Sequence, residues 1–385
     1  MSMFKKIISI VLSVVLCFSA SIMCSATGGL EKELIDENII TLSDISYAKE
    51  TIFTNLEAIL INTPEALGFN SQEVSEISLG EGFTISNVTG NTVSEVKDIM
   101  YFPIISDNNV IALITLIKYN GELSASIGKD FAKSLSSYLQ NTQTSFSLFA
   151  FNQNIYAIDT NSHIEGIFNS KEVSNDVDEI ISNISFSKVS KSNNTLSCSL
   201  FENASIIDLK TNNVELQQAR SYKFLDYPIV FQGSLPVCWA ATVAAMVMHE
   251  IKSMPELTAT EVCDAINHSY TGGSAQDIIR ALKYYLPSIY APTYYSRAMT
   301  KAEVQTIINN IDPACMLSHD VNSSNRHATS LCGYSISGST FNIRIMDSAY
   351  ECFKFSTYSS AHGFRFAFGN TQYEWDSTVR LLYNL

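Results

Sequence analysis

The order of helical and strand patterns in residues 222–385 constrains the fold more than any other feature of this sequence. Apolar residues first recur at helical spacing, and runs rich in β-branched and aromatic residues come only afterwards. The expected helices cover residues 238–251, 258–266, 274–285 and 300–309, and the expected strands cover 314–318, 328–335, 341–346, 364–368 and 377–383. This order predicts an α+β domain in which helices come first and a largely antiparallel sheet second.

Residues 27–184 show a different pattern, which predicts a second and smaller α+β domain. Helical spacing spans residues 30–61, and another helix is expected over 130–139. Two apolar runs, 101–105 and 110–117, flank the turn-forming Asp107-Asn108-Asn109 and therefore predict a β-hairpin. Two further strands are expected at 146–151 and 155–158.

Composition and charge support a division into two halves. A chain of 385 residues is too long for one compact core. Residues 185–221 lack periodicity and are rich in polar residues, which predicts a linker. Residues 27–220 carry a net charge of −14 and residues 221–385 only −2, so the halves are expected to have different roles. The acidic total excludes nucleic acid as an expected partner.

The first 26 residues resemble an export signal. Lys5 and Lys6 precede a short apolar run over 7–18, and Cys24-Ser25-Ala26 offers a small-x-small cleavage site. The run is too short for a comfortable membrane span, and the bulky Met23 disfavours lipid attachment at Cys24. The sequence therefore predicts a secreted, extracellular protein with no membrane span in the mature chain.

Six cysteines follow this leader: Cys198, Cys238, Cys263, Cys315, Cys332 and Cys352. In an exported protein some of them could form disulfides. If Cys238 stays a free thiol, an odd number remains, so at least one more is unpaired. No CxxC pair occurs, so we do not expect structural zinc.

Cys238 is the strongest candidate for a catalytic residue. It stands at the expected start of an Ala-rich helix and two residues after Pro236. The unpaired N–H groups of a helix N-terminus stabilise a thiolate, which attacks carbonyl carbons far better than a thiol does. Gln232 lies six residues earlier, where its side-chain amide could donate a hydrogen bond to an oxyanion beside the N–H of Cys238.

A thiolate of this kind needs an imidazole, and His327 is the preferred candidate. His327 opens one expected strand, and Asp347 ends the next. Adjacent antiparallel strands can place these two side chains in contact, so that the acid orients the imidazole. His319, also at a strand end, is the alternative base.

The segments around these residues resemble the papain-like cysteine peptidases, most closely the staphopain group of secreted bacterial peptidases. The resemblance is carried by residues 232–240 (QGSLPVCWA), by His327-Ala328 with the following strand to Gly333-Tyr334, and by the aromatic Tyr373-Glu374-Trp375. It implies a papain-like domain over 222–385, in which Cys238 is the nucleophile, His327 the general base and acid, and Gln232 an oxyanion donor. Asp347 stands where the family has asparagine. The family's nearby Trp is absent, and Tyr350 is expected to take its place.

These observations predict a secreted cysteine endopeptidase, made as a zymogen, that acts on protein or peptide substrates. Catalysis through an acyl-enzyme on Cys238 would need no metal or cofactor. Residues 27–184 would be a pro-domain that inhibits the enzyme by covering the cleft until the linker is cut. One alternative is a Cys-His cell-wall (peptidoglycan) hydrolase, although such enzymes often use a second histidine where Asp347 stands. The other alternative is a non-catalytic surface binding protein.

Overall fold

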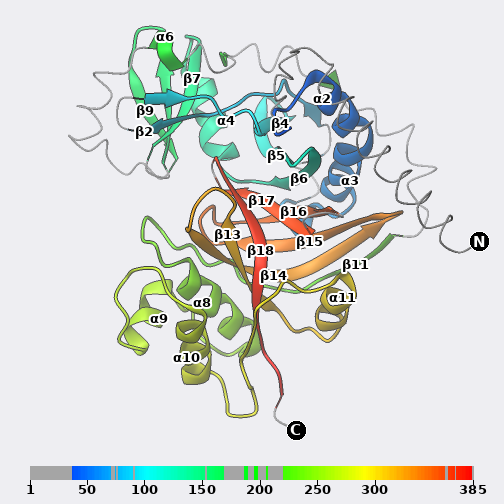
Figure 1. Ribbon diagram of the computed structural model, residues 1–385, viewed down its shortest axis with the longest axis vertical. Coiled ribbons are helices and arrows are strands. Elements are labelled where there is room, and N and C mark those ends of the chain that lie inside the picture. The colour runs from blue at the N-terminus through cyan, green and yellow to red at the C-terminus, as the bar shows by residue number, and fades with distance from the viewer. Residues whose placement is uncertain are drawn as a thin grey trace, which may run out of the picture.

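The computed structural model describes residues 37–70, 74, 77–89, 92–151, 154–168, 186–189, 195–197, 205–206, 220–359, 363–368 and 370–383. The expected signal peptide, Cys198 and most of the stretch in which a cut is expected lie outside these residues. The described residues form two halves, with the N-terminal half at the top of Figure 1 and the C-terminal half below it.

The C-terminal half has the predicted α+β order. Its helices are α8 (Cys238–Glu250), α9 (Ala259–Ala265), α10 (Ala275–Tyr285) and α11 (Lys301–Asn309), and its main strands are β13 (Ala314–Asp320), β14 (Arg326–Ser337), β15 (Thr340–Asp347), β16 (Cys352–Ser359), β17 (Gly363–Phe368) and β18 (Thr371–Arg380). Each of α9, α10 and α11 begins with a capping box, in which a Ser or Thr side chain and an acid three residues later satisfy each other's backbone N–H groups. Local sequence therefore fixes where these helices begin.

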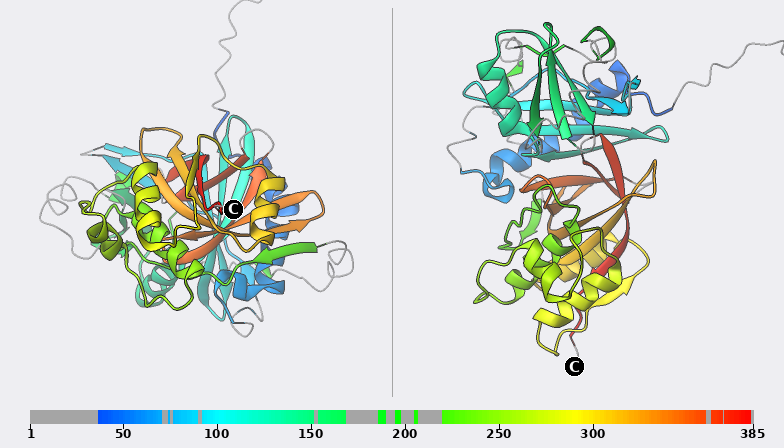
Figure 2. Two further views of the ribbon diagram at one scale, coloured as in Figure 1. Left: turned by 90° about the horizontal axis from the view of Figure 1, so that it is seen from below. Right: turned by 90° about the vertical axis from the view of Figure 1, so that its left-hand side faces the viewer.

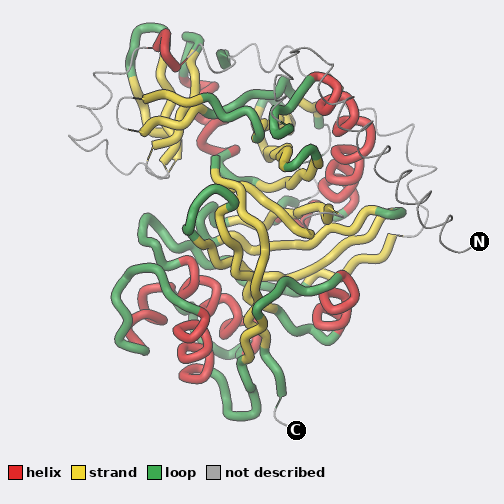
Figure 3. The backbone as a smooth tube through the Cα atoms, viewed as in Figure 1, coloured by secondary structure: helices red, strands yellow, loops and turns green. Residues whose placement is uncertain are grey.

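The six strands of this half close into an antiparallel barrel. Each strand from β13 to β18 pairs with the next, and β18 pairs back with β13. Two short strands extend it, because β11 (Arg220–Phe224) pairs with β14 and β12 (Thr293–Tyr295) pairs with β18. Helices α8, α9 and α10 lie together on the side of the barrel away from the N-terminal half, which is clear in Figure 3.

Among its described residues, the N-terminal half contains a long helical segment, a short 3-10 helix at Pro64–Leu67, a further helix and parts of two sheets. The helical segment runs through α2 (Leu42–Ala48), a π-helical turn (Lys49–Phe53) and α3 (Thr54–Asn62). Strands β1 (Ser78–Leu79), β4 (Ile99–Ser106), β5 (Asn109–Tyr119) and β6 (Glu122–Gly128) belong to one sheet, and α4 (Ala132–Asn141) follows them. The second sheet contains β2 (Ser86–Thr89), β3 (Thr92–Ser94), β7 (Phe146–Phe151), β8 (Asn154–Asp159) and β9 (Ile164–Phe168). The predicted hairpin is present as β4 and β5, and its turn residues Asp107 and Asn108 have φ of 50° and 58°.

The two halves share one sheet and part of one core. Strand β6 pairs with β16 through Lys354 opposite Gly128, Phe355 opposite Ile127 and Ser356 opposite Ser126. This pairing joins the N-terminal strands to the barrel in a 13-stranded sheet. The right-hand view of Figure 2 shows the N-terminal half stacked on the end of the barrel. The sequence patterns revealed neither β6 nor β16, and they therefore did not reveal this connection.

The described parts of the expected linker up to residue 206 pack on the N-terminal half, whereas residues 220–221 begin β11 and pair with β14. Helix α6 (Phe186–Val189) ends at the buried Val189, and Leu196 forms a bridge with Phe146. Strand β10 (Ser205–Ile206) pairs with β1. These pieces are two to four residues long, too short to show a periodicity, so the sequence suggested unstructured chain. Within the described residues, no helix is both long enough and apolar enough to cross a membrane.

Candidate active site

Cys238 is the first residue of α8 and lies half-buried at the helix N-terminus. The backbone N–H of Trp239 donates to its sulfur, and the N–H of Ala328 on β14 lies 3.4 Å from the same atom. Backbone donors of this kind are fixed by the helix and the strand, so they stabilise negative charge on sulfur without having to reorganise. The predicted position of the cysteine at a helix start is confirmed.

His327 and Asp347 meet as predicted. Pairing of β14 with β15 brings the beginning of one strand next to the end of the other, and His327 Nε2 lies 3.0 Å from Asp347 Oδ1. Because Nε2 contacts Asp347, Nδ1 is the ring nitrogen available to Cys238, and the imidazole is hydrogen-bonded to the sulfur of that residue. The side chains of His327 and Asp347 are 5% and 0% exposed, so water does not compete for either contact. The three side chains form a continuous hydrogen-bonded chain.

The electrostatics of this chain favour a charged pair. Burial raises the pKa of the Cys238 thiol. The hydrogen bond and charge of His327, together with two backbone N–H groups, lower it by more than burial raises it, so the net shift is downward. Burial lowers the pKa of His327, yet the carboxylate of Asp347 and the hydrogen bonds on both sides raise it to about 10. At neutral pH these opposite shifts favour thiolate on Cys238 and imidazolium on His327.

Gln232 lines the same cleft as Cys238 and is held in one orientation. The hydroxyl of Ser348 donates to Gln232 Oε1 at 2.9 Å, and the backbone N–H of Gln232 donates to the carbonyl of Ser348 at 3.0 Å. Its amide nitrogen donates to the carbonyl of Leu235 at 3.1 Å and has a second N–H available. Gln232 and Cys238 line the same cleft, so this amide can reach an oxyanion formed there.

The cleft over Cys238 has a volume of about 560 Å³. Its lining comes from the start of α8, from the loop before α10, from β12 and from the barrel strands β13, β14 and β18, through Gln232, Pro236, Cys238, Trp239, Gly272, Gly273, Ser274, Ala275, Tyr294, Leu317, Ser324, Asn325, Arg326, His327, Ala328, Tyr373 and Ser377. Within the part of the chain that the structure describes, no residue of the N-terminal half lines this cleft. The expectation that residues 27–184 cover Cys238 is therefore not met by the described part of that domain.

One wall of the cleft requires glycine. A Cβ atom on Gly273 would lie 2.6 Å from the indole of Trp239, which is buried and donates its Nε1–H to the carbonyl of Thr271 at 2.9 Å. Because the indole is fixed by this bond, it cannot move aside for a larger residue. The backbone at Gly273 therefore lies directly against Trp239, the residue that follows the candidate nucleophile.

The arrangement has the parts needed for nucleophilic attack on a carbonyl: an activated thiolate, an imidazole, an orienting acid and oxyanion donors. Comparison with models of known protein families and with curated protein sequences gave no match. The functional assignment therefore depends on the chemistry of the cleft itself.

The ring that packs on His327 differs from the one expected. The centroid of Tyr373 lies 5.6 Å from the imidazole and that of Phe366 6.3 Å from it. Tyr350 instead stacks on Phe168 of the N-terminal half at 4.7 Å, and its ring faces the ammonium of Lys354 at 4.8 Å. The expectation for Tyr350 is wrong because β17 and β18 bring their own aromatic residues to the histidine.

The alternative base is placed elsewhere. His319 Nδ1 lies 3.1 Å from Asp376 Oδ2, its side chain is 37% exposed, and it does not line the cleft. All five described cysteines are free thiols, and burial raises the pKa of the four other than Cys238: Cys263, Cys315, Cys332 and Cys352. Among the described residues no cluster of three His, Cys, Asp or Glu could hold a metal ion.

Two charged residues of the site were not predicted. Lys354 Nζ lies 3.0 Å from Asp347 Oδ2 and 2.8 Å from Asp130 Oδ1. The charges of Lys354 and His327 hold the pKa of Asp347 well below its usual range although burial acts in the opposite direction. A signal existed in the sequence, because a strand at 352–359 paired with the strand ending at Asp347 would place Lys354 diagonally across from the acid.

Proposed function

We propose that this protein is a papain-like cysteine peptidase that hydrolyses peptide bonds in protein or peptide substrates. The observation that carries this proposal is the hydrogen-bonded chain from Cys238 through His327 to Asp347, which begins at a helix N-terminus in an open cleft. Gln232 completes the set, because it offers an amide donor in the same cleft.

In the proposed reaction, the thiolate of Cys238 attacks the carbonyl carbon of the scissile bond, and the electron pair of the C=O bond moves to oxygen. The N–H of Cys238 and the side-chain amide of Gln232 donate to this oxyanion. When the C–N bond breaks, the imidazolium of His327 gives its proton to the leaving amine. His327 then takes a proton from water, which attacks the thioester, and release of the acid product restores the thiolate.

We further propose that the protein is exported and processed, as the leader pattern of residues 1–26 and the polar stretch 185–221 suggest. Inhibition by the N-terminal half would then depend on residues outside the described ones, since those described leave the cleft open. Mass spectrometry of the secreted protein tests the processing, because a zymogen should be cut close to residues 198–222.

The nucleophile is tested by Cys238→Ala, with Cys263→Ala as the matched control because Cys263 is a buried free thiol away from the cleft. Casein cleavage and labelling by a thiol-reactive epoxide should disappear in the first variant and persist in the second. Unchanged cleavage in Cys238→Ala would refute the proposal. Release of muropeptides from cell walls, without casein cleavage, would instead identify the cell-wall hydrolase.

A further inference from the structure

The charged chain of the active site continues beyond Asp347 into the N-terminal half. Asp347 contacts His327 through Oδ1 and Lys354 through Oδ2, and Lys354 in turn contacts Asp130, which lies between β6 and α4. The side chains of Lys354, Asp347 and Asp130 are 1%, 0% and 7% exposed. In their ionised forms these groups alternate in sign along the whole chain, from the thiolate of Cys238 to the carboxylate of Asp130.

The pairing of β6 with β16 fixes this contact. Lys354 stands opposite Gly128, and a Cβ atom on that glycine would lie 2.9 Å from the Cβ of Lys354. The absence of a side chain at Gly128 lets the two strands approach, and the chain then turns at Asp130, whose φ of 32° is unfavourable for a residue other than glycine. The ammonium of Lys354 also lies 3.4 Å from the carbonyl of Ala367.

The remaining titratable groups that face this chain are neutral near pH 7. They come from β4, from β13, from the turn between β15 and β16, from β16 itself and from β18, and burial raises the pKa of each: Tyr101, Cys315, Tyr350, Cys352 and Tyr373. Burial and the charge of Asp347 raise the pKa of Asp130, and the Lys354 ammonium at 2.8 Å opposes this shift without cancelling it. With Asp130 ionised, Asp130, Lys354 and Asp347 together carry one negative charge, which faces His327.

We propose that Lys354 and Asp130 are positioning residues for the active site, and that the N-terminal half therefore contributes to the active enzyme. The inference rests on the proposed peptidase function. Lys354 holds one oxygen of Asp347 and so leaves the other directed at the imidazole. Asp130 compensates the ammonium, because a buried cation needs a second carboxylate when the first must also serve His327.

The summed charge of Asp130, Lys354 and Asp347 predicts how variants of these residues should behave. Asp130→Asn makes the group neutral, so the imidazolium of His327 loses support and its proton leaves at lower pH. Lys354→Met brings two carboxylates together without a cation, which increases the negative charge or forces one acid to take a proton. The double variant returns the group to a single negative charge on Asp347. The two single changes should therefore perturb the site, and their combination should restore it.

The test uses full-length protein carrying Asp130→Asn, Lys354→Met or both, with Asp98→Asn as the control. Asp98 is another acid between the halves, and it accepts from the amide of Gln372 at 2.6 Å rather than from Lys354. The readouts are the pH dependence of kcat/KM and the pH dependence of Cys238 alkylation by iodoacetate, an anion that reacts faster with the thiolate while the imidazolium of His327 keeps its proton, so that its rate falls as that proton leaves. Alkylation reports on the thiolate even if the protein cleaves no peptide, so failure of the proposed function is distinguishable from failure of this inference.

In Asp130→Asn we expect the alkaline limb of both profiles to move to lower pH by about one unit. The double variant should return to within about 0.3 units of the wild-type limb, a margin well inside the shift that one nearby charge produces, and Asp98→Asn should not move it. Identical profiles in Asp130→Asn and wild type, or a double variant no closer to wild type than the single one, would overturn the inference. If Lys354→Met does not fold, the other variants still decide.

Discussion

The barrel has two contact surfaces, and they are built differently. Toward α8, α9 and α10 it leaves a cleft of about 560 Å³, in which Cys238 is half-buried and open to a substrate. Toward the N-terminal half it continues as one sheet through β6 and β16, and the side chain of Phe355 lies fully buried in the core around α3 and β4. The first surface leaves Cys238 accessible to a substrate, and the second is continuous with the N-terminal half.

The described part of the N-terminal half does not contact the barrel in the way that a removable cover of the cleft would. A removable cover would be expected to contact the cleft and to leave the far side of the barrel self-contained. The described residues show the reverse, since Arg344 of β15 donates its Nε–H to the carbonyl of Ala66 in the N-terminal half at 2.6 Å. A cut in the stretch 198–222 is therefore expected to leave two chains that remain associated.

The largest expected effect lies on the cleft side. His327→Ala removes the group that both activates the thiol and protonates the leaving amine, so kcat/KM should fall by about 10²–10⁴-fold. His319→Ala is the matched control, because that histidine is half-exposed and pairs with Asp376 outside the cleft. Peptide hydrolysis measured for both variants checks this, and an equal loss in the two would contradict the assignment of His327.

The next effect lies on the side of the N-terminal half. Phe355→Ala removes a ring that packs edge-on against Phe224 at 5.4 Å within the core of the N-terminal half, and it should lower the free energy of unfolding by about 3–5 kcal/mol. Phe353→Ala on the same strand is the control, because Phe353 belongs to the larger core cluster and packs on Arg344. Urea unfolding measures the loss in both.

A protease site added within residues 207–219 then tests whether the ring of Phe355 holds the two halves together or only stabilises the core. After cutting, the fragments of Phe355→Ala should elute separately on gel filtration, whereas those of Phe353→Ala should elute together. Co-elution of the Phe355→Ala fragments would show that this ring is not needed to hold the halves together.

The residues of the cleft were predictable because each carries a local signal. Cys238 follows an irregular segment and opens an Ala-rich helix, and His327 and Asp347 lie at opposite ends of neighbouring strand patterns. Gln232 stands at a fixed spacing before the cysteine. Signals of this kind can be recognised from the sequence alone, without the tertiary structure. The positions of all four residues agree with them.

The connection between the halves could not be predicted, because the two strands that form it lack a clear sequence pattern. Strand β6 reads Glu-Leu-Ser-Ala-Ser-Ile-Gly and β16 reads Cys-Phe-Lys-Phe-Ser-Thr-Tyr-Ser, and neither has the continuous apolar pattern of β5. A buried lysine in particular argues against a core strand unless its partners are known. Those partners, Asp130 and Asp347, come from different halves of the chain, so only the tertiary structure brings them together.

Asp347 lies where the two surfaces meet, and its replacement should have an intermediate effect. Asp347→Asn removes the charge that raises the pKa of His327 to about 10, so the alkaline limb of activity should move to lower pH by about 1–3 units. The raised pKa stabilises the folded protein fully below the ordinary value of 6.5, and this contribution is lost as pH rises through 10. The stability lost in Asp347→Asn should therefore be larger at pH 6 than at pH 10.5.

Urea unfolding at the two pH values measures this difference, with Asp376→Asn as the control because it removes the acid partner of the half-exposed His319. A loss of stability that does not depend on pH would show that Asp347 acts by packing and not by its charge on His327.

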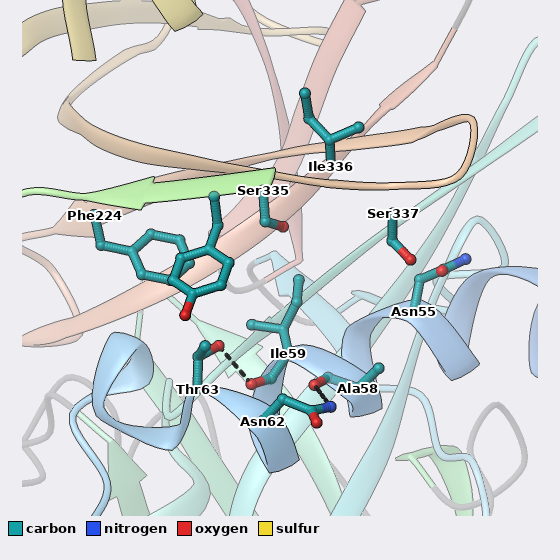
Figure 4. Close-up of a pocket in the computed structure, with 10 residues that line it drawn as sticks. Asn55, Ala58, Ile59, Asn62, Thr63, Phe224, Ser335, Ile336 and Ser337 are labelled. Carbon is teal, nitrogen blue, oxygen red and sulfur yellow. Dashed lines mark hydrogen bonds between the residues drawn. The ribbon is translucent and has the colours of Figure 1, made fainter. Parts of the chain in front are cut away.

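The smallest effect is expected at the other end of the contact between the halves, where α3 faces β11 and β14. A cavity of about 260 Å³ lies there, and Figure 4 shows Asn55, Ile59 and Thr63 of the helical side facing Phe224 and Ser335 of the strands. Packing is therefore looser here than around Phe355, and the hydrogen bond from Asn55 Nδ2 to Thr340 Oγ1 across this contact is long, at 3.3 Å.

Asn55→Ala should cost only about 0.5–1.5 kcal/mol, because the bond is long and both groups can be satisfied by water in its absence. Asn62→Ala is the matched control, since its side chain donates to the carbonyl of Ala58 within α3 and lines the same cavity. The free energies of unfolding of the two variants, measured with urea, should agree within about 1 kcal/mol. A loss in Asn55→Ala as large as that in Phe355→Ala would mean that the whole contact between the halves, and not only the part around Lys354 and Phe355, holds them together.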